Sequence, residues 1–183
     1  MVTEIRAPNL GDLETLRCHL PDSDGMSHEA CLKGHTADRG IYLVAWAGDV
    51  PVGRLFLAWQ NSEIPRILQT HPQARQFSES PEIRDVYVDP GHRSRGIGTH
   101  LIREALACAD RHTACGATIC VNVDNPRARA LYERLGFSEP GIGVFTTEGT
   151  FTDKDGNEAP WQNGPQLLLA RESSNARADV PSD

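Results

Sequence analysis

The segment 86–99 contains the residues best suited to chemistry, because it joins a β-branched strand end to a basic, glycine-bearing loop and then to a helix. The first turn of a helix presents unpaired backbone N–H groups at the positive end of its dipole, where a pyrophosphate can bind. Gly96 and Gly98 lack a Cβ, so the main chain can approach phosphate oxygens closely. Polar or positive side chains lie in the same loop, namely those of His92, Arg93 and Arg95. This junction predicts a binding site for a phosphate-bearing cofactor.

A second informative segment, 122–137, reads Asn-Val-Asp-Asn-Pro-Arg-Ala-Arg-Ala-Leu-Tyr-Glu-Arg-Leu-Gly-Phe. The Arg93-x-x-Gly96-x-Gly98 spacing resembles the acyl-CoA-binding loop of the GNAT superfamily of N-acetyltransferases. The second segment is similar to that family's pattern of an Asn, then Ala, then Leu-Tyr-x-x-x-Gly-Phe. The P-loop motif and the dinucleotide-binding glycine motif are both absent from the sequence. The resemblance covers residues 81–138 closely and 1–60 only in general layout.

Hydrophobic patterning along the chain alternates between strand-like and helix-like stretches. We expect strands over 3–6, 41–47, 50–59, 83–88 and 117–123, from 137 onward, and over 166–170. We expect helices over 9–19, 97–111 and 127–135, with a short further helix and a loop within 21–40. Asn9 or Asp12 would cap the first helix. Residues 60–80 and 148–164 are expected to be long connections.

This order of elements predicts one mixed α/β domain, 1–171, followed by a polar, disordered tail, 172–183. The resemblance implies a central mixed, mostly antiparallel sheet of six to seven strands. Helices flank that sheet, and it is splayed between strands four and five.

The composition of the 183-residue chain excludes several classes of protein. Its 18 basic and 25 acidic residues give a net charge of −7, which argues against binding to bulk nucleic acid. The sequence has no apolar run of membrane-spanning length and no signal segment at its N-terminus, so we expect no membrane partner and a cytoplasmic location. Five cysteines without a framework spacing favour reduced thiols. His28-x-x-Cys31-x-x-x-His35 lacks a fourth ligand, so we expect no metal site.

The resemblance assigns the cofactor, acetyl-CoA, to particular groups. It implies that the pantetheine arm lies along the main chain of Val86, Tyr87 and Val88, like an added strand. It implies that the pyrophosphate is bound by backbone amides of Ser94, Arg95, Gly96, Ile97, Gly98 and Thr99. Asn125 matches the asparagine that contacts the cofactor arm, and it would also serve as a helix N-cap. The side chains of Arg93 and Arg95 either contact the cofactor or form a solvated basic edge.

Two residues are candidates for proton transfer. Tyr132 matches the family's tyrosine, which would donate a proton to the departing thiolate; phenol and thiol pKa values lie within about two units of each other. Without the motif, Tyr132 would be read as a core aromatic residue. Glu82 lies eleven positions before Arg93, about where some protein-lysine acetyltransferases of the family carry a glutamate that deprotonates the amine.

Alternatives to Glu82 as the base remain open. Asp85 is a rival on the opposite strand face, ordered water can serve alone, and Glu82 can be a solvated strand-end carboxylate. Other relatives carry a carboxylate on strand five, where this chain has Cys120.

The resemblance thus implies transfer of an acetyl group from acetyl-CoA to a primary amine, by direct attack in a ternary complex. A non-catalytic acyl-CoA sensor or assembly module is the alternative, since it would need the cofactor loop but neither Tyr132 nor Glu82. The acceptor is a small-molecule amine or a protein amine, and a homodimer is possible because dimers are common in the family. Segments 21–40, 60–80 and 146–164 would shape the acceptor site. Trp59 and Trp161 would line it or pack structurally.

Overall fold

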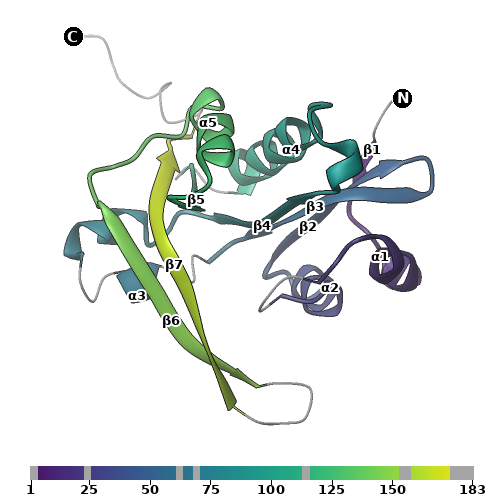
Figure 1. Cartoon of the computed structure of the whole chain (residues 1–183), viewed down its shortest axis with the longest axis horizontal. Helices are drawn as coiled ribbons and strands as arrows, with labels where there is room; N and C mark the ends of the chain where they lie inside the picture. Colours follow the sequence, from purple (N-terminus) through teal and green to yellow (C-terminus); the bar gives the residue numbers. More distant parts are fainter. Residues whose placement is uncertain are drawn as a thin grey trace.

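The computed structural model describes residues 4–22, 26–60, 64–67, 71–112, 116–152 and 158–173. Seven strands form one sheet in the order β1-β2-β3-β4-β5-β7-β6 (Figure 1). The strands are β1 (Glu4–Arg6), β2 (Gly40–Ala47), β3 (Val50–Ala58), β4 (Glu82–Val88), β5 (Ala117–Asn122), β6 (Val144–Thr152) and β7 (Glu158–Arg171). Neighbouring strands are antiparallel except for β4 and β5, which are parallel. The predicted mixed, mostly antiparallel sheet is confirmed.

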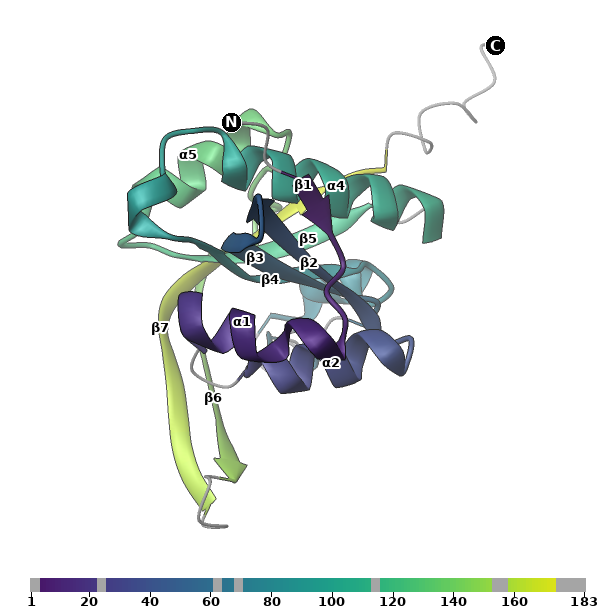
Figure 2. The same cartoon turned by 90° about the vertical axis from the view of Figure 1, so that its right-hand side faces the viewer.

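Helices cover both faces of the sheet, as Figures 1 and 2 show. On one face lie α1 (Leu13–His19) and α2 (His28–Thr36), and on the other lie α4 (Ile97–His112) and α5 (Pro126–Arg134). The short helix α3 (Ile64–Ile67) lies beside β6. Three 3-10 turns complete the described elements, Leu10–Asp12, Pro72–Phe77 and Pro90–His92. No helix in the described parts of the chain has the length and apolar character needed to span a membrane.

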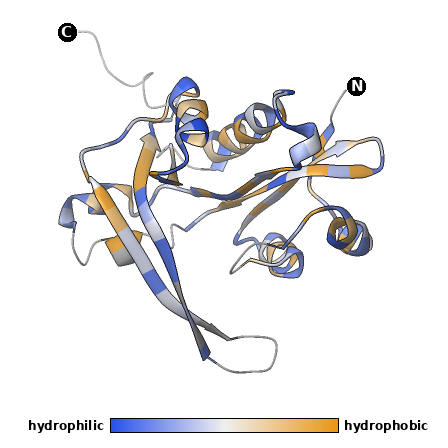
Figure 3. Cartoon of the chain, viewed as in Figure 1, coloured by the Kyte–Doolittle hydropathy of each residue, from blue (hydrophilic) through white to orange (hydrophobic). Residues whose placement is uncertain are grey.

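Each helical layer buries its own apolar core against the sheet. The side chains of Ile97, Leu101, Ile102, Ala105, Leu106 and Ala109 form the buried stripe of α4. On the other face, α1 and α2 pack on Tyr42, Val44, Trp46 and Phe56. Figure 3 shows apolar residues concentrated where the helices face the strands. The sheet is therefore the middle layer of the fold, and β4 lies near its centre.

The first helix begins as the sequence indicates, although its first turn is tighter. Asn9 Oδ1 accepts a hydrogen bond from the Gly11 amide at 2.8 Å, and the Asn9 amide donates to Asp12 Oδ2 at 2.9 Å. This reciprocal arrangement is a capping box. Asn9 is thus the N-cap, and the predicted helix consists of a 3-10 turn followed by α1.

The connection predicted over 60–80 is wrong in part, because it contains α3 and a 3-10 turn that bury apolar side chains. Ile64, Ile67 and Ala74 are buried against Ile142, Phe145 and Leu168. Two isoleucines three positions apart cover one face of a single helical turn, which is too short a pattern to stand out among polar neighbours.

The loop predicted over 148–164 is also wrong, because β6 and β7 extend into a long antiparallel hairpin through these residues. Strand β6 begins at Val144 rather than Phe137, which lies outside any strand. The glycines and prolines in this stretch suggest a loop, yet the hairpin tolerates them, since Gly149 pairs with Trp161 and Thr150 with Pro160. The hairpin projects away from the sheet (Figures 1 and 2), and polar residues predominate along its outer part (Figure 3).

Strands β4 and β5 separate after a short parallel contact. Glu82 pairs with Thr118 and Ile83 with Ile119, and no further pair joins the two strands in the described residues. A β-bulge follows in β4, where Arg84 pairs with Phe56 but Tyr87 already pairs with Arg54, so that two β4 residues lie opposite Leu55. This divergence confirms the predicted splay between strands four and five.

Candidate functional site

A cleft of about 460 Å³ opens where β4 and β5 separate. It is bounded by the end of β4, the loop before α4, the first turn of α4 and one face of α5. Of the residues proposed from the sequence, it brings together Val86, Tyr87, Val88, Arg93, Ser94, Gly96, Ile97, Gly98, Thr99, Asn125 and Tyr132. Arg95 is exposed and Glu82 is buried, and neither lines this cleft. Residues from two separate sequence motifs thus form one surface.

The loop before α4 is fixed by its backbone conformation and by Asp89. Ser94 and Gly96 have φ angles of 64° and 81°, in the left-handed region that glycine adopts without strain. Asp89 Oδ2 accepts hydrogen bonds from the Gly91 amide at 3.0 Å and from His92 Nδ1 at 2.7 Å. The His92 hydrogen bond, helped by the Gly91 amide, lowers the pKa of Asp89 below its usual range. These contacts hold the loop in the turn that leads into α4.

The first turn of α4 presents its amides at the cleft. The His100 amide donates to the Gly96 carbonyl at 3.0 Å, so the amides of 97–99 precede the first bond of the helix. A Cβ placed on Gly98 would lie 3.4 Å from Leu131 Cδ2 and 3.8 Å from Val88 Cγ2. Gly98 therefore lies where β4, α4 and α5 approach one another. An anion here would meet both free amides and the positive end of a 16-residue helix.

Arg93 makes a contact that the sequence does not indicate. Its Nε donates a hydrogen bond to the Val88 carbonyl at 3.0 Å. The guanidinium thus folds back along the end of β4, and Arg93 braces the strand that lines the cleft.

Asn125 is the N-cap of α5, as predicted. Its Oδ1 accepts a hydrogen bond from the Ala128 amide at 3.1 Å. The side chain is exposed and lines the cleft. Capping uses the side-chain carbonyl oxygen of Asn125, so both N–H groups of Nδ2 remain available to a ligand.

Tyr132 packs in the core and also lines the cleft. Its side chain is 6% exposed, packs edge-to-face on Phe137 with ring centroids 6.2 Å apart, and lines the cleft. Burial raises the pKa of Tyr132 to about 12. The phenol is therefore neutral near pH 7, and its O–H group is a hydrogen-bond donor.

The two candidate carboxylates differ from expectation. Glu82 is only 3% exposed and lies 3.9 Å from Arg84 Nη1, so the reading of Glu82 as a solvated strand-end residue is wrong. Asp85 was expected on the opposite strand face. The bulge instead turns Asp85 towards Arg54, with which it forms a buried ion pair. One extra residue in a strand reverses the faces of the residues that follow it, so alternation alone could not place Asp85.

Several cleft residues are not among those proposed from the sequence, namely Arg127, Ala128, Leu131 and Arg134, whereas His92 lines the cleft as part of the predicted basic loop. Arg127 Nη2 donates to Ser94 Oγ at 2.8 Å, which joins the start of α5 to the loop before α4. Arg127 and Arg134 are seven positions, or two helical turns, apart, and this spacing is the signal that could have placed both on the cleft.

Trp59 and His28 each make close side-chain contacts within the fold. Trp59 stacks on His112 with ring centroids 3.8 Å apart, and it does not line the cleft. The side chain of Trp161 lies outside the described residues. His28 uses both ring nitrogens, at 2.6 Å from Tyr42 Oη and 2.9 Å from the Leu20 carbonyl. In the described part of the chain, no group of three His, Cys, Asp or Glu residues is arranged to hold a metal ion.

Two of the described cysteines have thiols whose pKa is raised by burial. Cys18, Cys31, Cys108 and Cys120 carry no disulfide, and Cys115 lies outside the described residues. Burial raises the pKa of Cys31 to about 12 and also raises that of Cys108. A thiol with a raised pKa is a poor nucleophile near neutral pH.

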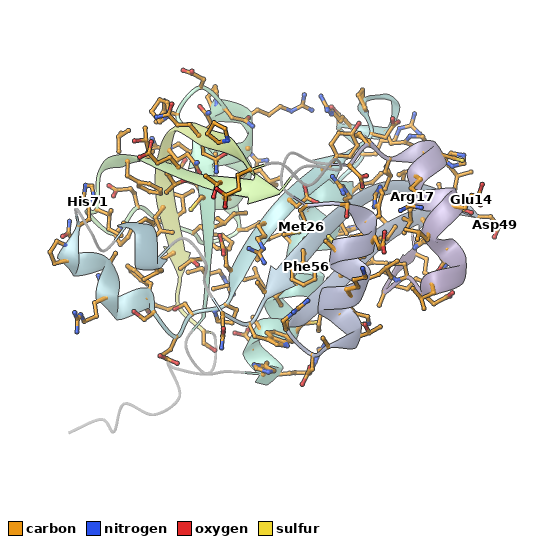
Figure 4. The ribbon with its side chains drawn as sticks, turned by 90° about the horizontal axis from the view of Figure 1, so that it is seen from below. Glu14, Arg17, Met26, Asp49, Phe56 and His71 are labelled. Atoms are coloured by element: carbon orange, nitrogen blue, oxygen red, sulfur yellow. The ribbon has the colours of Figure 1, made fainter. Side chains whose placement is uncertain are left out.

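The face of the sheet opposite α4 and α5 is flanked by the segments expected to shape an acceptor site. In the view from below, Met26 and Phe56 lie between the α1–α2 pair and the β6–β7 hairpin (Figure 4). Phe56 belongs to β3, and the Arg84 guanidinium lies 5.6 Å from the centroid of its ring. This side is built from side chains of several separate segments.

Comparison with curated proteins identifies relatives over part of the chain. An uncharacterized N-acetyltransferase of Methanocaldococcus jannaschii is 43% identical over 64 residues, which are 35% of this chain and 28% of that protein. The mycothiol acetyltransferase of Nocardia farcinica is 33% identical over 89 residues, 49% of this chain and 27% of that protein. The streptothricin acetyltransferase of Streptomyces lavendulae is 28% identical over 133 residues, 73% of this chain and 62% of that protein. The chain thus spans less than two thirds of the length of these relatives.

Solved structures share the fold at low sequence identity. The ribosomal-protein-S18-alanine N-acetyltransferase from Escherichia coli superposes with a TM-score of 0.63 at 15% identity, covering 99% of this chain and 100% of that one. The PaiA N-acetyltransferase from Thermoplasma acidophilum, in complex with coenzyme A, has a TM-score of 0.60 at 16% identity, covering 94% of this chain and 99% of that one. The sequence model of the acetyltransferase (GNAT) family matches residues 9–137, which include both motifs and the splayed strands. The chain belongs to the GNAT family of acetyltransferases.

Proposed function

We propose that the protein transfers the acetyl group of acetyl-CoA to a primary amine, by direct attack of the amine on the thioester in a ternary complex. The observation that carries this proposal is the cleft itself. It combines the edge of β4 that β5 leaves uncovered, the amides of a helix N-terminus and a buried phenol.

The cofactor would lie along this cleft from the phosphate end to the thioester. The amides of 94–99 would hold the pyrophosphate, since they meet the positive end of α4. The pantetheine arm would bind the main chain of 86–88 in place of a neighbouring strand. Asn125 Nδ2 would donate to that arm, and Arg127 would add positive charge beside the phosphates.

Tyr132 would act on the leaving group. As the amine nitrogen bonds to the carbonyl carbon, the C–S bond breaks and negative charge develops on sulfur. A neutral phenol can donate a hydrogen bond to that sulfur or protonate it. Burial keeps the phenol neutral, which supports a donor role.

Glu82 would remove a proton from the acceptor ammonium, directly or through a water molecule. It is a buried carboxylate at the start of β4, on the same side as Arg84 and Phe56. Asp85 is a weaker candidate because both of its oxygens contact Arg54. The acceptor itself would be an amine of a small molecule or of a protein, since relatives named for each kind of acceptor are similar to the chain.

The experiment is a thiol-release assay with acetyl-CoA and a panel of amines, amino acids, aminoglycosides and lysine peptides, preceded by calorimetry with CoA. We expect CoA binding and turnover with one class of amine. Binding without turnover across the panel would instead support a cofactor sensor. Absence of CoA binding would contradict the assignment of the cleft.

A further inference from the structure

Asp85 holds an unusual backbone conformation at the point where β4 turns away from β5. Its φ is 57°, in the left-handed region where non-glycine residues are uncommon, although aspartate is among those that tolerate it. Before Asp85, β4 pairs with β5; after it, Val86–Val88 line the cleft. The conformation of this one residue therefore directs the strand edge that the cofactor would use.

Arg54 of β3 contacts Asp85 through both ends of its guanidinium. Nη2 donates to Asp85 Oδ1 at 3.2 Å, and Nη1 lies 3.1 Å from Oδ2. The Arg54 side chain is 1% exposed and that of Asp85 is 9% exposed. A buried guanidinium requires a charged partner, and the hydrogen bond from Nη2 to Oδ1 directs the Asp85 carboxylate towards Arg54. Arg54 is thus placed to hold Asp85 in its bulged position.

A side chain on the strand beside Arg54 is fixed to α2. Val44 of β2 pairs with Arg54 of β3, and Tyr42 lies two residues before Val44 on the same strand. The Tyr42 hydroxyl lies 2.6 Å from His28 Nδ1, and His28 Nε2 donates to the Leu20 carbonyl at 2.9 Å. Burial raises the pKa of Tyr42.

We propose that Arg54 is a positioning residue for the cofactor: through Asp85 it holds β4 in the bulged conformation that presents the main chain of 86–88 to the cleft. This rests on the proposed function, in which the pantetheine arm lies along that main chain. Arg54 does not line the cleft, and it acts by setting the course of the strand.

The test uses substitutions at both positions, with the CoA dissociation constant measured by calorimetry. Arg54→Met removes the guanidinium that orients Asp85. We expect CoA binding to weaken about tenfold, because the free energy that disfavours a left-handed non-glycine residue corresponds to roughly that factor in the dissociation constant. Adding Asp85→Gly to Arg54→Met should restore affinity to within about threefold, because glycine adopts a positive φ without a partner. Adding Asp85→Ala removes the same charge but disfavours the same φ, so affinity should stay low.

The contrast between the two double variants decides the proposal, since a purely electrostatic pair would respond equally to glycine and alanine, which both remove the charge of Asp85. Equal CoA affinity of the two double variants, whether high or low, would overturn it. If the double variants do not fold, Asp85→Asn and Asp85→Ala provide the second comparison, because asparagine tolerates a positive φ and alanine does not. There the asparagine variant should bind CoA more tightly, and equal affinities would again overturn the proposal. Failure of the unsubstituted protein to bind CoA would contradict the proposed function rather than the role of Arg54.

Discussion

The two sides of the splayed sheet are built in different ways. The side proposed to bind the cofactor, called the cofactor side here, presents backbone groups from one continuous stretch, in which β4, the loop and the first turn of α4 follow one another in the chain. The opposite side, between α1–α2 and the β6–β7 hairpin, is formed by side chains of segments that are far apart in the sequence. A site made of backbone amides recognises a common chemical group and tolerates changes of side chain. A site made of distant side chains can change its specificity without disturbing the cofactor.

This comparison predicts that chemistry and cofactor binding can be separated at Tyr132. We expect Tyr132→Phe to lower kcat at least about 100-fold, because general acid catalysis contributes roughly that much or more. CoA affinity should change less than about threefold, since the ring remains packed on Phe137. Thiol-release kinetics and calorimetry measure the two quantities. Equal losses in both would mean that Tyr132 serves binding or folding rather than proton donation.

The role of backbone shape on the cofactor side can be isolated with two glycines. Gly96 and Gly141 both have a φ of 81°, with no atom within 4 Å of the point that a Cβ would occupy, and Gly141 does not line the cleft. Alanine at either position should cost about 1–2 kcal/mol of backbone strain. Only Gly96→Ala should also weaken CoA binding, by about tenfold, as calorimetry would show. A matching loss of affinity in Gly141→Ala would indicate a general loss of stability.

Side-chain charge on the cofactor side should contribute less than the backbone. Arg127→Ala removes the contact with Ser94 and one positive group from the cleft, and we expect CoA affinity to fall roughly threefold to fivefold at low salt. Arg129→Ala is the matched control, because Arg129 is exposed on the same helix and pairs with Glu133 at 2.7 Å, away from the cleft. The difference between the variants should shrink as salt is raised. A loss that does not depend on salt would contradict an electrostatic role for Arg127.

The smallest expected effect is on stability at alkaline pH. The pKa of Tyr132 is raised by burial to about 12, above the value of about 10 for an unfolded chain. The stabilising free energy of the buried, neutral phenol is therefore fully present below pH 10, and it is lost as the pH rises towards 12. In that interval, the free energy of unfolding of the wild-type protein should fall more steeply with pH than that of Tyr132→Phe, by up to about 1 kcal/mol per pH unit. Urea unfolding of both proteins between about pH 9 and 11.5 measures this difference, and parallel curves would mean that the phenol is solvated.

The cofactor side was largely predictable from the sequence, because its determinants are local. A strand, a glycine-bearing loop and a helix in succession place Gly96, Gly98 and Thr99 together, and the Asn125 N-cap places α5. Tyr132 followed from the motif in α5.

The opposite side was not predictable, because its determinants are not local. Asp85 changes face through a bulge that leaves no mark in the alternation of β4. Arg54 would ordinarily be read as an exposed strand residue, yet it is buried and paired with Asp85 of β4. Ile64 and Ile67 are buried in a cluster with Ile142 and with Phe145 and Leu168 of the β6–β7 hairpin. Such partners are known only once the chain is folded.

The most direct test of the account is backbone amide hydrogen exchange with and without CoA. The account predicts slower exchange on CoA addition at 86–88 and 94–99, with unchanged exchange in the outer part of the β6–β7 hairpin. Protection confined to the hairpin or to α1 and α2, with 94–99 unaffected, would contradict the assignment of the cofactor to this cleft.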